Sequence, residues 1–143
     1  MPMPYIHFQG RCAEALTFYA DVFAASDLSM MRYSDAPDLD DTLRDPTRVI
    51  HGQLTLPDGI LMASDYPPGM TGDPQAAVSL MTVSDTVAEA KRVFAALSHG
   101  GTVIQDFGST FFSRGFGMLK DRYGTHWMVS VAPEDPLDAT ADA

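Results

Sequence analysis

The sequence is short of cysteine, of basic residues and of long apolar runs, and each shortage excludes a class of protein. Cys12 is the only cysteine among 143 residues, which excludes an internal disulfide and a Cys-x-x-Cys metal or redox site. Only 9 Lys and Arg accompany 19 Asp and Glu, for a net charge of -10, and this balance argues against nucleic-acid partners and anionic membranes. No apolar run reaches the roughly 18 residues of a membrane-spanning helix. The first ten residues lack the basic and apolar regions of a signal peptide, so we expect a cytoplasmic protein.

What the sequence does contain is enough apolar material for one core. Apolar residues make up 45% of the chain, the proportion of an ordinary globular domain. We expect a single domain over residues 1–132, followed by a flexible acidic tail over residues 133–143. Cys12, at the start of a predicted helix, is either a reactive thiol or a small residue packed at a turn.

The apolar pattern predicts the same order of elements twice, in modules at about 4–66 and 77–132. The first module has a strand at 4–9, a helix at 12–25, a strand at 29–33, an exposed acidic loop at 34–48, and strands at 49–56 and 60–64. The second has a strand at 77–83, a helix at 87–98, and strands near 102–106, 115–120 and 125–131. Asp58-Gly59 between two apolar runs is a strong hairpin signal. The acidic loop lacks the glycine and closing glutamate of a calcium-binding EF-hand. The sequence therefore predicts an α+β fold of tandem βαβββ modules.

Several spaced motifs carry a resemblance to a known family. They are Tyr5-Ile6-His7-Phe8-Gln9-Gly10, Cys12-Ala13-Glu14-Ala15, Leu61-Met62-Ala63-Ser64-Asp65, Phe116-Gly117-Met118-Leu119 and Asp121-Arg122-Tyr123-Gly124. In this order they resemble the PhnB-like branch of the glyoxalase/bleomycin-resistance/dioxygenase (vicinal oxygen chelate) superfamily over residues 4–131. The resemblance implies a cup-shaped mixed sheet whose concave faces enclose a small-molecule site. It also implies a homodimer.

The resemblance places four metal ligands in the cup of metal-using members, where His, Gln and Glu side chains supply hard donors. Here those places fall near Met3, Met62, Ser79 and Met128. A thioether is a soft, weak donor, so we expect no metal and no cofactor. An alternative stays open, in which His7 and His126, with Gln9, Tyr5 or Ser79, form a rearranged metal site.

The residues expected to line the cup are Tyr5, His7, Gln9, Met62, Ser79, Met81, Arg114, His126 and Met128. The methionines are either core filler or a deformable apolar pocket. Arg114 is either a surface residue or a cation that grips a carboxylate or phosphate. Trp127 is assigned to the core by alternation, and His51 could face either side of its strand.

We therefore predict a protein that binds an unidentified small molecule in an apolar cup without the usual metal. Two alternatives remain, a metal-dependent lyase, isomerase or dioxygenase and a structural or regulatory dimer without a ligand. Whether the protein is an enzyme stays open. PhnB-like proteins are sometimes labelled as ubiquinone methyltransferases, but this chain lacks the glycine-rich loop that would hold a nucleotide cofactor.

Overall fold

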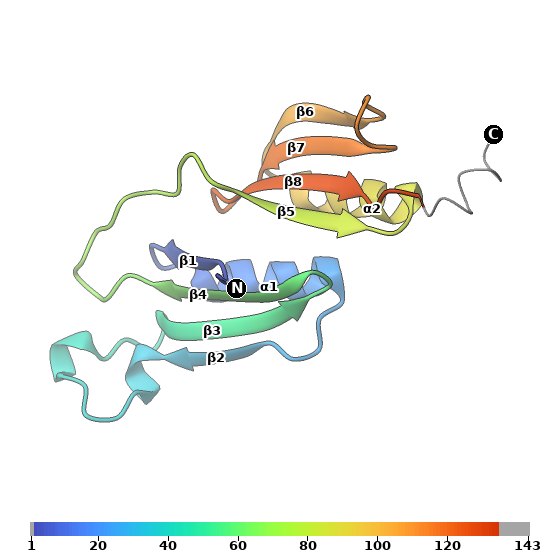
Figure 1. Ribbon diagram of the computed structural model, residues 1–143. Helices are drawn as coiled ribbons and strands as arrows, with labels where there is room; N and C mark the ends of the chain where they lie inside the picture. Colours follow the sequence, from blue (N-terminus) through green and yellow to red (C-terminus); the bar gives the residue numbers. More distant parts are fainter. Residues whose placement is uncertain (1, 135–143) are drawn as a thin grey trace. The chain divides into compact units, whose positions relative to one another are not determined.

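The computed structural model describes residues 2–134, in which one order of strands and helix occurs twice (Figure 1). The chain divides into two compact units, Met1–Val78 and Ser79–Ala143. The division falls at the end of the segment predicted to link the two modules. Most of the predicted tail, residues 135–143, lies outside the described residues. No helix in residues 2–134 is long and apolar enough to cross a membrane.

The first unit is a four-stranded mixed sheet with one helix. Its elements are β1 (Tyr5–Phe8), α1 (Cys12–Phe23), β2 (Ser29–Arg32), β3 (Val49–Leu56) and β4 (Gly59–Asp65). The strand order is β1-β4-β3-β2, with β1 parallel to β4 and the other pairs antiparallel. The hairpin predicted at Asp58-Gly59 is confirmed, since Leu56 pairs with Gly59 across the turn.

The second unit repeats this plan strand for strand. Its elements are β5 (Ser79–Ser84), α2 (Val87–Ser98), β6 (Thr102–Gly108), β7 (Phe116–Lys120) and β8 (His126–Val131). The order is β5-β8-β7-β6, and β5 is parallel to β8. The predicted α+β fold of two βαβββ modules is therefore confirmed, with two open sheets rather than a closed barrel.

Each helix forms because its apolar residues recur on one face, which then packs on the sheet of its own unit. On α1 the buried residues include Leu16, Tyr19 and Val22, at the three- and four-residue spacing of a helical stripe. On α2 the hydroxyl of Thr86 caps the first turn by accepting a hydrogen bond from the Glu89 amide at 3.1 Å. Such a cap satisfies one of the backbone donors that a helix start leaves unpaired.

A glycine on the sheet lets each helix approach closely. A Cβ added at Gly52 on β3 would lie 2.5 Å from the Leu16 side chain of α1. A Cβ added at Gly117 on β7 would lie 2.6 Å from the Phe94 ring of α2. Both distances are below any real Cβ contact, so a larger residue at either place would push the helix away. The helix of each unit thereby fixes which face of its sheet is covered and which is left open.

The predicted loop at 34–48 is more structured than expected. It contains two short 3-10 turns, η1 (Tyr33–Asp35) and η2 (Asp41–Leu43), and Ala36 within it is buried. Asp45 accepts hydrogen bonds from the Thr47 amide and hydroxyl at 2.7 and 2.6 Å. Aspartates in this segment therefore hold the backbone in turns. The apolar pattern missed them because a three-residue turn is too short to show a period.

Candidate functional site

The sheet of the first unit has a face that α1 does not cover. Strand alternation puts Ile6 and Phe8 on the buried side, as predicted, and leaves Tyr5 and His7 exposed. Register places Tyr5 beside Met62 and His7 beside Ser64, and Met62 beside Gln53 on β3. We call this surface the first open face, and its members used below are Tyr5, His7, His51, Gln53, Met62 and Ser64.

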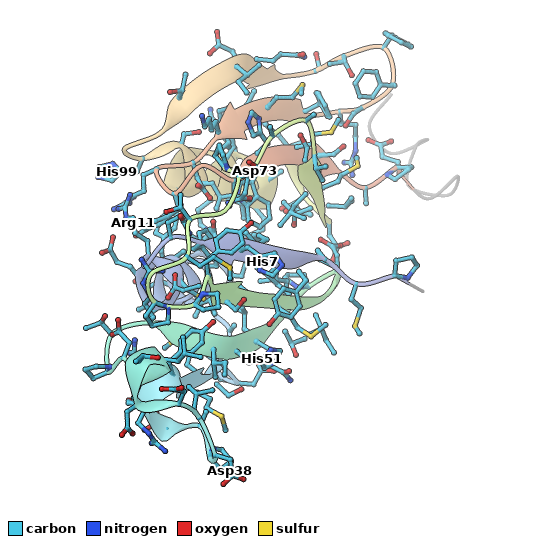
Figure 2. All side chains as sticks on the ribbon, turned by 90° about the vertical axis from the view of Figure 1, so that its left-hand side faces the viewer. His7, Arg11, Asp38, His51, Asp73 and His99 are labelled. Carbon is cyan, nitrogen blue, oxygen red and sulfur yellow. The ribbon has the colours of Figure 1, made fainter. Side chains whose placement is uncertain are left out.

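Four rings follow one another across the first open face, and we call them the ring row. The Tyr66 ring stacks on His7 with centroids 5.3 Å apart and planes at 26°. His7 lies 5.2 Å from Tyr5, and Tyr5 lies 5.7 Å from His51. Figure 2 shows the labelled His7 and His51 on neighbouring parts of this sheet. The row places four rings next to one another on the side of the sheet that α1 does not cover.

Hydrogen bonds fix the orientation of both histidines. The Tyr5 hydroxyl lies 3.0 Å from Nδ1 of His51, and Nε2 of His51 lies 3.1 Å from Oε1 of Gln53. With the Gln53 oxygen toward the ring, an acceptor at this place requires a proton on Nε2, and in the neutral ring Nδ1 is then free to accept from the phenol. Nδ1 of His7 lies 3.3 Å from the Ser64 hydroxyl. Tyr5, His51 and Gln53 thus form a chain of phenol, imidazole and amide.

The segment after β4 holds one end of the ring row in place. The backbone at Gly72 lies so close to the Tyr66 ring that a Cβ there would overlap it. The Gly72 amide donates to Oε1 of Gln9 at 3.3 Å. Gln9 was predicted to line the cup, and its amide oxygen binds the backbone of the segment that follows β4. Gly72 is therefore needed for close contact with Tyr66.

His51 is a member of the site that the sequence did not place. It pairs with Met31 of β2, and a register shift follows between Met31 and Arg32. Such a bulge changes which residues of a strand share a face. The only signal in the sequence was the alternation of His51 with Gly52 and Leu54, which are buried against α1.

The open face of the second unit is different in kind. Met81 on β5, Met128 on β8 and Met118 on β7 are direct neighbours across three strands, and we call them the methionine row. Ser79 and His126 are paired in the next position on the same face. Met118 was not among the predicted residues, although it alternates with buried Gly117 and Leu119. Trp127 is 1% exposed, which confirms its assignment to the core.

The resemblance places the ligands of metal-using members near Met3, Met62, Ser79 and Met128, which supply three thioethers and a hydroxyl. Met3 is 54% exposed before β1 begins. In residues 2–134 no three His, Cys, Asp or Glu side chains form a group that could hold a metal. A hard ion requires oxygen or nitrogen donors converging at one point, and this donor set does not supply them.

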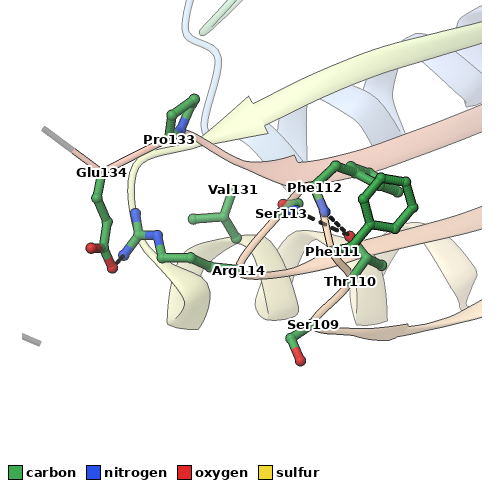
Figure 3. Close-up of a pocket in the computed structure, with 9 residues that line it drawn as sticks. All are labelled: Ser109, Thr110, Phe111, Phe112, Ser113, Arg114, Val131, Pro133 and Glu134. Carbon is green, nitrogen blue, oxygen red and sulfur yellow. Dashed lines mark hydrogen bonds and ion pairs between the residues drawn. The ribbon is translucent and has the colours of Figure 1, made fainter. Parts of the chain in front are cut away.

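Arg114 lies at a shallow pocket of about 410 Å³ beside the β6–β7 connection (Figure 3). Its guanidinium donates to the carbonyl oxygens of Asp85 and Ala132 at 3.3 and 3.0 Å and pairs with Glu134 at 3.4 Å. These contacts tie the chain after β8 to the end of β5. Of the two interpretations of Arg114, a surface residue or a cation that grips an anion, these contacts show a guanidinium that already pairs with Glu134 in its own unit.

A buried carboxylate organises the base of the first unit. Asp65, 1% exposed, accepts hydrogen bonds from the amides of Gly10, Cys12 and Val49 at 2.7, 3.0 and 2.9 Å. The pKa of the Cys12 thiol is raised to about 12. Burial is the main cause, and the nearby negative charge of Asp65 is the second. The same two causes raise the pKa of Tyr33, whose hydroxyl donates to the Asp65 carbonyl at 2.9 Å. Cys12 is also fully buried. The structure therefore supports a small packed residue over a reactive thiol.

Known proteins resemble this chain along nearly its whole length. Protein YjdN of Escherichia coli (strain K12) is 27% identical over 146 residues, covering 95% of this chain and 99% of its own. The crystal structure of protein PA1353 from Pseudomonas aeruginosa has a TM-score of 0.83 at 33% identity, with 94% and 98% of the two chains covered. A PhnB protein from Bacillus cereus, which carries a 3-demethylubiquinone-9 3-methyltransferase name, has a TM-score of 0.69 at 29% identity and coverage of 92% and 98%.

More distant structures agree on the fold. A glyoxylase/bleomycin resistance protein/dioxygenase domain from Frankia sp. EAN1pec has a TM-score of 0.64 at 10% identity, covering 93% of this chain and 97% of its own. Residues 2–130 match the family described as 3-demethylubiquinone-9 3-methyltransferase. The chain therefore belongs to that PhnB-like family, and its fold is that of the glyoxalase/bleomycin-resistance proteins.

Proposed function

We propose that this protein binds a small, planar, uncharged organic molecule on the first open face, without a metal ion. The observation that carries the proposal is the ring row, in which Tyr66, His7, Tyr5 and His51 follow at centroid distances of 5.2 to 5.7 Å. Ligand sites are commonly built from aromatic surface with a few fixed polar groups. Tyr5 is 41% exposed, so its ring is accessible to such a ligand.

The polar groups of this face are already oriented before a ligand binds. His51 is held between Tyr5 and Gln53, and His7 is held between Ser64 and the Tyr66 ring. Fixed side chains lose little conformational freedom on binding, and this raises affinity at constant contact area. The arrangement supports recognition of a ligand that stacks on rings and exchanges one or two hydrogen bonds.

Charge argues for an uncharged ligand. The first open face, as defined above, is made of Tyr, His, Gln, Met and Ser, so none of its members carries a fixed charge. The whole chain has a net charge of -10, and such a field disfavours anions. Arg114, which was either a surface residue or a cation for an acidic group, is paired with Glu134.

The methionine row supports a second, apolar contact surface. Met81 is 53% exposed, and thioether side chains adapt to ligands of irregular shape.

In the same proposal the protein is a cytoplasmic homodimer. An exposed β6, with Val103 and Ile104 43% and 52% exposed, is an apolar edge of the kind that subunits cover. Sedimentation analysis tests the dimer: a monomer mass at micromolar concentration would remove it from the proposal.

The methyltransferase activity in the family description is not part of the proposal. A methyl group donor of the nucleotide type requires a glycine-rich loop between a strand and a helix. The turn from β1 into α1 reads Gly10-Arg11-Cys12, with one glycine. The turn from β5 into α2 reads Asp85-Thr86-Val87, with none.

A ligand screen read by histidine ring signals tests the proposal. The protein, labelled with ¹⁵N-histidine, is titrated with neutral aromatic ketones, quinones and heterocycles. We expect binders to shift the ring signals of His7 and His51 and leave His99, at the end of α2, unchanged. A ligand at 100 times its dissociation constant adds about 2.7 kcal/mol to the free energy of unfolding, which a thermal-shift assay detects.

Matched variants locate the site. Tyr5→Ala and His7→Ala remove rings from the row, and both are exposed, so the fold should persist. We expect binding about 2- to 13-fold weaker for each, since stacked aromatic contacts contribute about 0.5–1.5 kcal/mol. His99→Gln is the control. Equal binding by all four proteins would place the ligand elsewhere, and elemental analysis showing a stoichiometric transition metal would contradict the metal-free mode.

A further inference from the structure

The chain of Tyr5, His51 and Gln53 has the geometry of an acid–base relay. Oε1 of Gln53 lies 3.1 Å from Nε2 of His51, and the opposite ring nitrogen lies 3.0 Å from the Tyr5 hydroxyl. A hydroxyl, a base in contact with it and a third group that orients the base are the parts that activate a side-chain oxygen. The lone pair of Nδ1 therefore points at the phenol proton.

The phenol oxygen of Tyr5 is placed where a bound molecule could reach it. Tyr5 is 41% exposed, whereas its strand neighbour Ile6 is 6% exposed. The His7 ring next to it, with a centroid distance of 5.2 Å, offers a surface on which a planar ligand can stack. The reactive oxygen and the stacking surface belong to one face.

We propose that Tyr5 and His51 are a proton-transfer pair that interconverts the keto and enol forms of a planar, uncharged 1,3-dicarbonyl or aryl ketone. The proposal rests on the proposed function, because it needs the ligand to lie on the first open face. It adds a reaction class and names the two groups that move the proton. Gln53 is a positioning residue in this scheme.

The proton balance closes without a cofactor. Nδ1 of His51 takes the phenolic proton, and the Tyr5 oxygen removes the proton from the carbon between or beside the carbonyls. The C–H electron pair forms the C=C bond, and the C=O π pair moves to oxygen, giving an enolate. His51 then returns its proton through the Tyr5 hydroxyl to that oxygen, so the enol leaves with both side chains in their starting states. The reverse sequence gives the ketone, and nothing is oxidised or reduced.

The choice of substrate follows from the face. The proton must be acidic enough for a phenolate to remove it, which a carbon next to one or two carbonyls provides. Planar conjugation in the enol matches the ring row, so stacking favours the enol-like transition state over a bent ketone. An anionic keto acid suits the site less, since none of the six side chains that define the first open face carries a fixed positive charge.

The test follows benzoylacetone, a neutral aryl 1,3-diketone, by the ultraviolet absorbance of its enol. The full chain is mixed with the enol form, and ketonisation is timed against buffer and against the His99→Gln control. We expect acceleration that is lost in Tyr5→Phe, which keeps the ring and its stacking but removes the hydroxyl. His51→Gln should lose about 10²-fold or more, in the range of general acid–base catalysis, and Gln53→Leu about tenfold.

The protonation pattern of His51 gives a readout that does not need a substrate. Nitrogen chemical shifts distinguish a protonated from an unprotonated ring nitrogen, and we expect the proton on Nε2 in the wild type. Gln53→Leu should yield a mixture of both tautomers, which a residue of purely structural importance would not cause. A wild-type proton on Nδ1 would overturn the relay.

The outcomes separate this inference from the proposed function. Benzoylacetone that shifts the His7 signal but ketonises at the buffer rate overturns proton transfer and leaves ligand binding standing. Acceleration that survives in Tyr5→Phe also overturns the pair. If neutral ring compounds neither bind nor react, both the proposed function and this inference fail.

Discussion

Replacing Asp65 by Asn should lower the stability of the first unit, because the buried Asp65 carboxylate accepts hydrogen bonds from three backbone amides. The two carboxylate oxygens accept three backbone amides: Oδ1 accepts from Gly10 and Cys12, and Oδ2 accepts from Val49, all within 3.0 Å. An asparagine keeps one acceptor oxygen and turns the other into a donor. Whichever way the amide is oriented, at least one backbone N–H then meets an NH₂ group.

The cost can be worked from the groups left without an acceptor. With the amide nitrogen toward Val49, that backbone N–H and the new side-chain N–H are both buried and unsatisfied. At about 1–3 kcal/mol for each buried donor, the loss is about 2–6 kcal/mol. Domains of this kind have about 5–15 kcal/mol in total. A loss of 3 kcal/mol lowers the Tm by about 6–12 °C, at about 2–4 °C per kcal/mol.

Thermal and urea unfolding, followed by far-ultraviolet circular dichroism, measures this loss. Asp38→Asn is the matched control, because Asp38 is exposed and has a φ of 57°, a backbone conformation that asparagine also adopts. We expect the control to change stability by no more than about 0.5 kcal/mol. A loss below about 1 kcal/mol in Asp65→Asn would refute the idea that this carboxylate holds three strands and a helix start together.

Three further predictions follow from buried contacts. Because burial raises the pKa of Cys12 to about 12, iodoacetamide at pH 8 should leave the native thiol unmodified and alkylate it only after denaturation, as mass spectrometry would reveal; rapid native alkylation would contradict this. Gly72→Ala pushes a methyl group into the Tyr66 ring and should lower stability by about 1–3 kcal/mol, whereas Gly108→Ala, with nothing within 4 Å of the added carbon, should do far less. Trp127→Phe removes the hydrogen bond from the indole N–H to Asp121 at 2.9 Å and should lower the free energy of unfolding by about 1.5–3 kcal/mol. Chemical denaturation measures this loss, and an unchanged free energy of unfolding would contradict the prediction.

The fold could be predicted from the sequence because its signals are local. Alternation of Ile6 and Phe8 with polar residues marks a strand that is half buried, and Asp58-Gly59 marks a hairpin. The helix at 87–98 was predicted with the bounds observed. Each of these signals lies within a few residues and needs no knowledge of distant contacts.

The site was predicted only in part because it depends on register and on which group pairs with which. Tyr5, His7 and Met62 share a face as expected, and His51 lies on that side of β3 because it alternates with buried Gly52 and Leu54, whereas the register shift near Val49 interrupts the alternation just before it. Met118 joins Met81 and Met128 through cross-strand pairing that a linear pattern does not show. The bonds that occupy Gln9 and Arg114 come from residues far along the chain.

Parallel pairing of the first and last strands within each unit has a consequence for synthesis on the ribosome. β1 pairs with β4, and all four strands of its sheet lie before Val78. The sheet can therefore complete its hydrogen bonds while the second unit is still being synthesised, at about 5–20 residues per second. The second sheet must wait for β8, because β8 is the strand with which β5 pairs in residues 2–134. Nascent chains stalled shortly after β7 should thus expose β5 as an unpaired strand. We expect a chaperone to bind the nascent chain most strongly at this stage.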